Sequence, residues 1–367
     1  MNSRERVFRA LNFEESDRVP IDVWMSGGFK RKLLSALGTS EEAFLDCHDV
    51  DLRYIEGPAY IGPSLRMFPD GGDEDTWGVR RRAVTVRTPG GEETYKEVCE
   101  SPLADATSVE EIEGYDHWPS PDWFDYSSIE VQCEEVRRRE KVAVFQGDRM
   151  NRIAQLKPAM YIRGIEQILV DMVDSPEIAE AIFRRIREFY CSYAERIFEA
   201  ANGKLDIVLT GDDFGSQNGP LVSPGMWTKF LGKGFADYVA LAKSHNLRVM
   251  HHTCGSVRQI VPLLMERGLD VLQSLQPEAA DMDPRALKAD FGDRLAFHGG
   301  ISIQKTMPFG TPEDIRREVR DRIEALAPGG GYILCTSHNI QADTPVENLE
   351  ALLRAYGDFG RYCQPGS

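Results

Sequence analysis

The stretch LRVMHHTCGSV, residues 247–257, is an apolar strand that runs out into a polar turn ending in glycine. Alternate side chains of a strand point to the same side, so His252 and Cys254 are expected to point together. An imidazole beside a thiolate is a ligand pair that zinc takes in proteins. The stretch therefore predicts a strand with a candidate metal site at its carboxyl end.

The same pattern of a short apolar run followed by a polar or glycine turn recurs along the chain. Helical segments separate the runs, and several of them begin with a cap residue followed by proline, as in Ser-Pro, Thr-Pro or Asp-Pro. The expected strands are residues 18–24, 51–57, 141–147, 205–211, 247–252, 269–275, 294–300 and 331–337. Eight strands that alternate with helices predict an α/β fold of the (β/α)8 TIM barrel type. A doubly wound open sheet is the competing architecture.

Two segments depart from this alternation. An N-terminal extension forms a helix with Ser3 as its expected N-cap. Residues 77–98 predict a β-hairpin with its turn at Pro89-Gly90-Gly91, which we interpret as an insertion over the barrel mouth. We expect residues 1–367 to form a single barrel domain.

Composition excludes several classes of partner. The net charge is 43 − 59 = −16, which argues against nucleic acid and anionic membranes. No apolar run approaches the ~20 residues of a membrane span, and residues 1–16 lack the apolar region of a signal peptide. Seven cysteines without short regular spacing indicate reduced thiols. We therefore expect a cytoplasmic protein.

Polar residues gather at the strand ends, where barrel enzymes place their reactive groups. Four of the seven histidines and two of the seven cysteines lie there. The candidates at the ends of the fourth to eighth strands are Asp212, Asp213, Phe214, His251, His252, Cys254, Gln273, Gln276, His298, Cys335, His338 and Asn339. Those from other strands and the last loop are Asp22, Trp24, Gln146 and Gln341.

Zinc is the expected ion, because nitrogen and sulfur ligands select it over magnesium or calcium. His252 and Cys254 would be joined by a ligand from the eighth strand, and Asp212, Asp213, water or substrate would complete the site. Simpler roles exist for several candidates. His251 is expected to point away and pack under a helix, His298 can be a hydrogen-bonded core residue, Asp212 and Asp213 can be turn or cap residues, and Cys335 can be a small apolar one.

The chain resembles the uroporphyrinogen decarboxylase-like superfamily, and most closely its corrinoid-linked zinc methyltransferase branch. The resemblance covers nearly the whole chain. Its motifs are SRERVFRALNFEESDRVPIDVW (3–24), DTWGV (75–79), GDDFGSQNGPLVSPGMW (211–227), HHTCGSV (251–257), HGGISIQ (298–304), FGTPEDI (309–315) and GGGYILCTSHNIQADTPVENL (329–349).

The resemblance implies a zinc (Zn2+) site made by His-x-Cys and a later cysteine. His252 and Cys254 match residue by residue, whereas His338 stands where the later cysteine is expected, with Cys335 three residues earlier. The third ligand is therefore His338 or Cys335, and we favour His338.

The implied activity is methyl transfer between a small methylated substrate or thiol and a corrinoid (cobalamin) on a partner protein. The enzyme could be a component of an O-demethylase, and a homodimer is one expected oligomeric state. We expect catalytic roles for Asp212, Asp213, His298 and Asn339. Substrate contacts are expected from Asp22, Trp24, Gln146, Phe214, Gln273 and Gln341.

Two alternatives differ in chemistry. A decarboxylase of the uroporphyrinogen type needs no metal, and its polyanionic substrate is bound through an arginine-rich segment after the first strand. Here that segment, VWMSGGFKRK (23–32), has no arginine before Arg31. The second alternative is a barrel that binds a small molecule without catalysis. Zinc content separates the metal enzyme from both.

Overall fold

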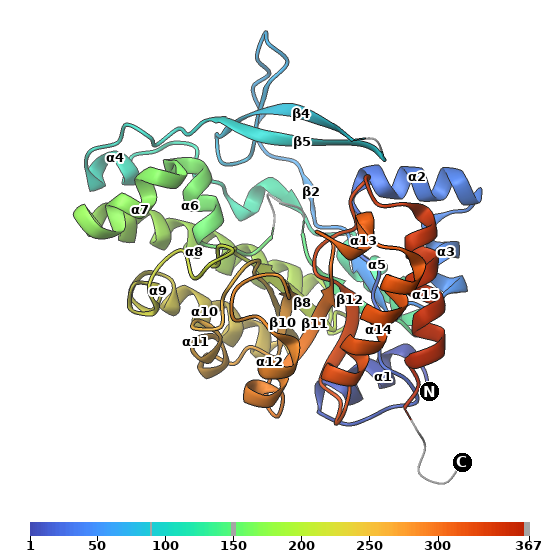
Figure 1. Cartoon of the computed structure of the whole chain (residues 1–367). Helices are drawn as coiled ribbons and strands as arrows, with labels where there is room; N and C mark the ends of the chain where they lie inside the picture. Colours follow the sequence, from blue (N-terminus) through green and yellow to red (C-terminus); the bar gives the residue numbers. More distant parts are fainter. Residues whose placement is uncertain (89, 148–151, 363–367) are drawn as a thin grey trace.

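A computed structural model describes residues 1–88, 90–147 and 152–362. Its centre is a parallel seven-stranded sheet in the order β1-β7-β8-β9-β10-β11-β12, which curls into a barrel surrounded by helices (Figure 1). The strands are β1 (Leu52–Ile55), β7 (Val142–Phe145), β8 (Ile207–Gly211), β9 (Arg248–His252), β10 (Val271–Leu275), β11 (Ala296–Ile301) and β12 (Tyr332–Thr336). Six of them lie within stretches predicted as strands and β11 extends one residue beyond its predicted stretch, so the predicted TIM barrel is confirmed.

The eighth position of the barrel is taken by residues 18–25, which form isolated bridges instead of a regular strand. Asp22 donates its backbone N–H to Leu334 of β12 over 2.9 Å, and the N–H of Asp51 donates to Ile21 over 3.0 Å. Proline at position 20 has no N–H to donate, which limits the ladder here. The segment nevertheless bonds to both edges of the sheet and closes the barrel.

Helix α1 (Ser3–Leu11) plugs the amino-terminal end of the barrel. Its Val7 and Leu11 pack in one buried cluster with inward-facing side chains of seven strands, among them Met250 of β9. Since side chains alternate along a strand, His252 lies on the same side as Met250. The plug at one end leaves the carboxyl ends of the strands as the open face.

The remaining helices cover the outside of the sheet and the barrel mouth. They are α2 (Gly27–Leu37), α3 (Glu41–Cys47), α4 (Val109–Glu113), α5 (Ile129–Arg138), α6 (Leu156–Arg163), α7 (Ile165–Asp174), α8 (Pro176–Ala200), α9 (Pro224–Phe230), α10 (Gly232–Ser244), α11 (Val261–Glu266), α12 (Pro284–Phe291), α13 (Thr306–Phe309), α14 (Pro312–Leu326) and α15 (Val346–Phe359). Across the described part of the chain, no helix combines the length and apolarity needed to cross a membrane.

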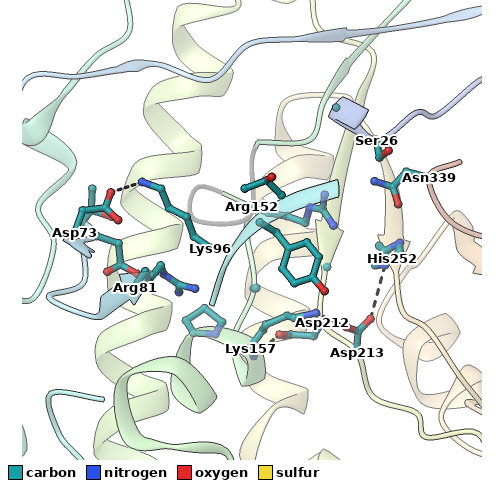
Figure 2. A pocket seen from close by; sticks show the side chains of 18 of the residues that line it. Ser26, Asp73, Arg81, Lys96, Arg152, Lys157, Asp212, Asp213, His252 and Asn339 are labelled. Carbon is teal, nitrogen blue, oxygen red and sulfur yellow. Dashed lines mark hydrogen bonds and ion pairs between the residues drawn. The ribbon is translucent and has the colours of Figure 1, made fainter. Parts of the chain in front are cut away.

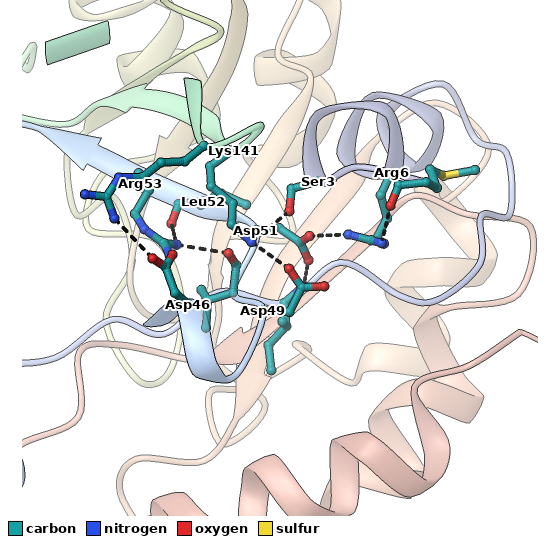
Figure 3. Close-up of polar contacts among 12 residues, drawn as sticks. Ser3, Arg6, Asp46, Asp49, Asp51, Leu52, Arg53 and Lys141 are labelled. Carbon is teal, nitrogen blue, oxygen red and sulfur yellow. Dashed lines mark hydrogen bonds and ion pairs between the residues drawn. The ribbon is translucent and has the colours of Figure 1, made fainter. Parts of the chain in front are cut away.

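A buried ionic network ties the N-terminal segment to β1 (Figure 3). The carboxylate of Asp51 is fully buried and accepts hydrogen bonds from Arg6 (2.7 Å), from Arg18 (2.8 Å) and from the backbone of Ile21 (2.8 Å). Nearby, Lys141 binds Asp49 over 2.6 Å. These contacts hold the barrel-closing segment against the sheet.

The predicted hairpin lies across the barrel mouth, at the top of Figure 1. It consists of β4 (Arg80–Thr88) and β5 (Gly91–Glu100), with β3 (Asp73–Glu74) paired to β4. Pro89, at the predicted turn, lies outside the described residues. The tip is held down by Lys32 of α2, whose ammonium donates to the carbonyls of Gly90 (2.7 Å) and Thr344 (2.9 Å). A second small sheet pairs β2 (Ala59–Tyr60) with β6 (Phe124–Asp125).

The structure corrects one local prediction. The N-cap of α1 is Asn2 and not Ser3, because the Asn2 side chain accepts the backbone N–H of Glu5 and the Glu5 carboxylate accepts the backbone N–H of Asn2. That residues 1–367 form a single domain stays a prediction.

Candidate metal site

The structure brings His252, Cys254 and His338 together at the open end of the barrel. One ligand atom from each lies within 4.8 Å of the other two. His252 ends β9, Cys254 follows two residues later on the same side, and His338 comes from the loop after β12. The Sγ of Cys254 lies 3.5 Å from Nε2 of His252. Both the strand alternation and the closure of the barrel are needed to make this cluster.

Aromatic packing fixes the two imidazole rings. Their centroids are 5.4 Å apart, and the Trp24 ring lies 5.4 Å from His252 and 5.2 Å from His338. Trp24 belongs to the barrel-closing segment, residues 18–25. The ionic network around Asp51 at the opposite end of the barrel therefore also helps to position the Trp24 ring against the two imidazoles.

Asp213, which follows β8, borders the cluster. Its Oδ1 accepts the backbone N–H of Cys254 (3.1 Å) and lies 3.7 Å from Nε2 of His252, as the dashed line in Figure 2 marks. Lys157 forms an ion pair with the same carboxylate. Burial opposes ionisation, but the neighbouring positive charge of Lys157 and the Cys254 N–H hold the pKa of Asp213 well below its usual range.

Burial sets the protonation states of the three candidate ligands. Burial lowers the pKa of both His252 and His338, so their imidazoles are neutral near pH 7. Burial, together with the charge of Asp213, raises the pKa of the Cys254 thiol to about 12. Neutral imidazoles are ready to bind a metal, and the thiol would have to lose its proton to do so.

Asp212 has a different environment from its neighbour. Its Oδ2 accepts the backbone N–H of Gln155 (2.6 Å) and Leu156 (3.1 Å), and its Oδ1 accepts that of Lys157 (2.7 Å). Burial raises the pKa of Asp212 to about 6, although these three N–H groups favour the charged form. Asp212 therefore caps the amino terminus of α6, which is the simpler role considered for it.

A second group lies deeper in the barrel and contains Asp22, His298 and Cys335. All three are at least 97% buried. Nε2 of His298 lies 2.9 Å from Oδ2 of Asp22, and the Tyr54 hydroxyl donates to the same oxygen over 2.6 Å. Cys335 thus belongs to a group separate from His252 and Cys254. Neither Asp22 nor His298 is among the described residues that line the cavity, and their substrate and catalytic roles stay predictions.

Three further candidates, Phe214, His251 and Gln146, are not among the described residues that line the cavity. Phe214 is fully buried, stacked on His251 at 5.1 Å and edge-on to Trp227, so its contact with a substrate stays a prediction. His251 points away from the site and packs under α10, as expected. Gln146 is half-buried, and it is not among the described lining residues.

The carboxamide side chains differ in their access to the cavity. Gln273 contacts an imidazole and does not line the cavity, whereas Asn339 and Gln341 do line it. Gln273 is fully buried, with its Oε1 2.6 Å from Nδ1 of His252. The Oδ1 of Asn339 contacts Nδ1 of His338, and Gln341 binds Asn339; both line the cavity. Gln276 accepts the backbone N–H of Gly255 over 3.0 Å.

The cluster borders a cavity of about 940 Å³ that the hairpin roofs over (Figure 2). Sequence reasoning missed this roof as part of the site, although the alternation in EETYKEV sends every second side chain to one face. It also missed Arg152 and Lys157. The lining residues that were not predicted include Ser26, Tyr60, Asp73, Asp75, Arg81, Glu93, Thr94, Tyr95, Lys96, Phe124, Arg152 and Lys157.

Comparison with known proteins adds a family and several relatives. The family model for uroporphyrinogen decarboxylase (URO-D) matches residues 153–359, more than half of the chain. A methylated-thiol–coenzyme M methyltransferase of Methanosarcina mazei is 26% identical over 54% of this chain and 49% of its own length. The methylcobamide:CoM methyltransferase MtaA of Methanosarcina barkeri is 28% identical over 46% of this chain and 45% of its own length.

A uroporphyrinogen decarboxylase of Coxiella burnetii is also similar, with 21% identity over 51% of this chain and 49% of its own length. The chain thus spans about half the length of the curated relatives it matches. Among solved structures, a methyltransferase from Methanosarcina mazei superposes with a TM-score of 0.69 and 18% identity, covering 98% of this chain and 99% of that one. This structural likeness supports the fold.

Proposed function

The chain belongs to the uroporphyrinogen decarboxylase family, and from that premise we propose that it is a zinc-dependent methyltransferase. It would move a methyl group between a small methylated substrate or thiol and a corrinoid carried by a partner protein. The observation that carries the proposal is the convergence of His252, Cys254 and His338 beside a roofed cavity. Two methyltransferases among the relatives support it.

The donor set fits zinc. Two neutral imidazoles and one sulfur are ligands that zinc prefers over hard-oxygen metals, and three protein ligands leave a position for substrate. Zinc held by His252, Cys254 and His338 would supply a Lewis acid that polarises the heteroatom of a methylated donor or lowers the pKa of an acceptor thiol.

The surrounding residues prepare this site for chemistry. Asp213 fixes the backbone at Cys254 through the N–H that it accepts, and Lys157 keeps its carboxylate in place. Trp24 forms a wall against both imidazoles. The hairpin covers part of the cavity, and a cover that limits the access of bulk water would strengthen the electrostatic interactions of a reacting group with its surroundings.

The charge of the cavity argues against a polyanionic porphyrinogen as substrate. Among the described residues, six acidic side chains line it but only four basic ones; they are Asp73, Glu74, Asp75, Glu93, Asp212 and Asp213 against Arg81, Lys96, Arg152 and Lys157. Two of the three basic residues after the first strand are also engaged. Lys30 pairs with Glu41 over 2.7 Å, and Lys32 binds backbone carbonyls. A substrate with few negative charges suits this cavity better.

The decisive experiment is a comparison of metal content. Wild-type protein loaded with zinc and then desalted should retain close to one zinc per chain, and Cys254→Ala should retain far less. Cys335→Ala is the matched control, because its sulfur belongs to the deeper group, and it should keep the wild-type content. A wild-type protein that holds no zinc would overturn the proposal, and loss of zinc only in Cys335→Ala would overturn the ligand set.

Activity can then be tested with free cobalamin as methyl acceptor. Zinc-loaded protein is mixed with reduced cobalamin and a panel of methylated ethers, amines and thiols, and methylation is followed by the visible spectrum of the corrinoid. Turnover by the wild type and none by Cys254→Ala is expected. A cytoplasmic location and a homodimer remain predictions from the sequence.

A further inference from the structure

Both imidazoles of the candidate metal site contact a side-chain carboxamide through the same ring nitrogen. Nδ1 of His252 lies 2.6 Å from Oε1 of Gln273, on the adjacent strand β10. Nδ1 of His338 contacts Oδ1 of Asn339, its neighbour in the chain. The two carboxamides come from different elements, yet they present the same atom type to the same ring position.

The orientation of the Asn339 amide follows from its surroundings. The Nε2 of Gln341 lies 3.3 Å from the backbone carbonyl of Asn339, and a carbonyl can only accept, so this atom of Gln341 is the donor. The same Nε2 lies 2.7 Å from the Asn339 side chain, which must therefore turn its oxygen toward it. That oxygen also faces His338, so Nδ1 of His338 carries the proton.

For His252 the argument comes from the metal-facing atom. Nε2 is the nitrogen that faces the cluster, 3.5 Å from the Cys254 sulfur. A neutral imidazole that offers the lone pair of Nε2 carries its proton on Nδ1. Gln273 must then accept that proton, and its burial on the adjacent strand leaves its side chain little freedom to move away.

We propose that Gln273 and the Asn339–Gln341 pair are positioning residues that hold His252 and His338 as Nδ1–H tautomers with Nε2 presented to a metal. This inference rests on the proposed function. Gln273, Asn339 and Gln341 were expected from the sequence to contact substrate or take part in catalysis. Here they act instead through the two imidazoles. Neutral carboxamides orient the rings without adding the negative charge that a carboxylate would bring to the ligands.

The tautomers can be measured in the metal-free protein. Two-bond ¹H–¹⁵N correlation spectra of protein labelled with ¹⁵N-histidine distinguish a protonated Nδ1 from a protonated Nε2, and His252→Gln and His338→Gln assign the signals. We expect bare Nε2 and protonated Nδ1 for both residues. A protonated Nε2 at either ring in the wild type would overturn the inference, whatever the metal affinity.

Zinc affinity, measured against a competing chelator, tests the consequence. Gln273→Leu and Asn339→Ala should each weaken binding on the order of 10- to 100-fold, the usual cost of losing an outer hydrogen-bond partner. Gln273→Glu keeps an acceptor oxygen and should restore affinity. Thr210→Val is the matched control, since its hydroxyl contacts Nδ1 of His251 (2.8 Å) on the opposite side of β9.

The outcomes separate this inference from the function on which it rests. A wild type that binds no zinc removes the proposed function, while the tautomer spectra still report on the carboxamides. A wild type that binds zinc, with Gln273→Leu equally tight or Thr210→Val equally weakened, leaves the metal site standing and overturns the positioning role.

Discussion

Replacing Asp51 by asparagine should destabilise the barrel at the end opposite to the metal site. The fully buried carboxylate accepts from Arg6 and Arg18, whose side chains are 4% and 14% exposed, and from the backbone of Ile21. In Asp51→Asn the side chain keeps its shape, but one oxygen becomes an NH2 group that faces a guanidinium. Two donors then meet, and two buried cations lose their shared anion.

The magnitude follows from what each arginine keeps. Removing one partner of a buried ion pair costs ~3–5 kcal/mol, because the remaining charge is left uncompensated. Arg6 retains Asp17 at 2.7 Å and Arg18 retains Asp49 at 2.7 Å, so the compensation is partial. We therefore expect a loss of ~3 kcal/mol in the free energy of unfolding, near the lower limit.

Urea unfolding followed by far-UV circular dichroism measures this loss as a lower midpoint at constant slope. The control is Asp49→Asn, which removes a carboxylate that is 60% exposed in the same network and should cost less than ~1 kcal/mol. Equal midpoints for wild type and Asp51→Asn would refute the reasoning. So would equal losses in the two variants, because burial would then not determine the cost.

Three further perturbations give distinct readouts. Burial disfavours the charged form of Asp49, but Lys141 helps to hold the pKa of this carboxyl below its ordinary 3.8. The stability that wild type has over Asp49→Asn should therefore be present above about pH 4 and vanish as pH falls further. A difference in urea midpoints that stays constant with pH would contradict this. Zinc affinity should rise about tenfold per pH unit near neutrality, since the raised pKa of Cys254 means that one proton leaves per zinc; a flat chelator titration would exclude this thiol as a ligand. Glu93 accepts the Gly28 N–H over 3.1 Å at the amino terminus of α2, so Glu93→Ala should release the hairpin tip from this helix. Limited proteolysis should then cut the hairpin faster, at an unchanged melting temperature. Equal cleavage rates in wild type and variant would argue against this role of Glu93.

The strands could be predicted because parallel strands buried on both faces are short continuous apolar runs between turns. Six of the seven strands of the barrel sheet lie within predicted stretches, and β11 ends one residue beyond its stretch. Residues 18–25 close the barrel where the first strand was expected. Helix α2 was missed because Gly27 and Gly28 open it, and glycine is a poor helix former. Its start depends on capping by Ser26 and on the hairpin packed above it, which no local pattern reveals.

The candidate site was predictable in its inner part only. His252 and Cys254 are two residues apart on one strand, so alternation alone places them together. Their distance to His338 depends on how β9 and β12 are arranged around the barrel, which the fold class supplies. The roof is different, because the hairpin reaches the cavity through contacts between segments far apart in sequence, and only their packing shows that Glu93 or Tyr95 faces the same space as His252.

Polar residues at strand ends proved to be of three physical kinds that residue type does not distinguish. Asp213 borders the open cavity, and its neighbour Asp212 spends both oxygens on the backbone of α6. His298 is paired with Asp22 in the deeper group. A reactive group needs an unshared lone pair that faces a space large enough for substrate, whereas a structural group has its hydrogen-bonding capacity used up by the fold. Whether His252 belongs to the first kind depends on the proton at Nδ1, and so on the carboxamide of Gln273 beside it.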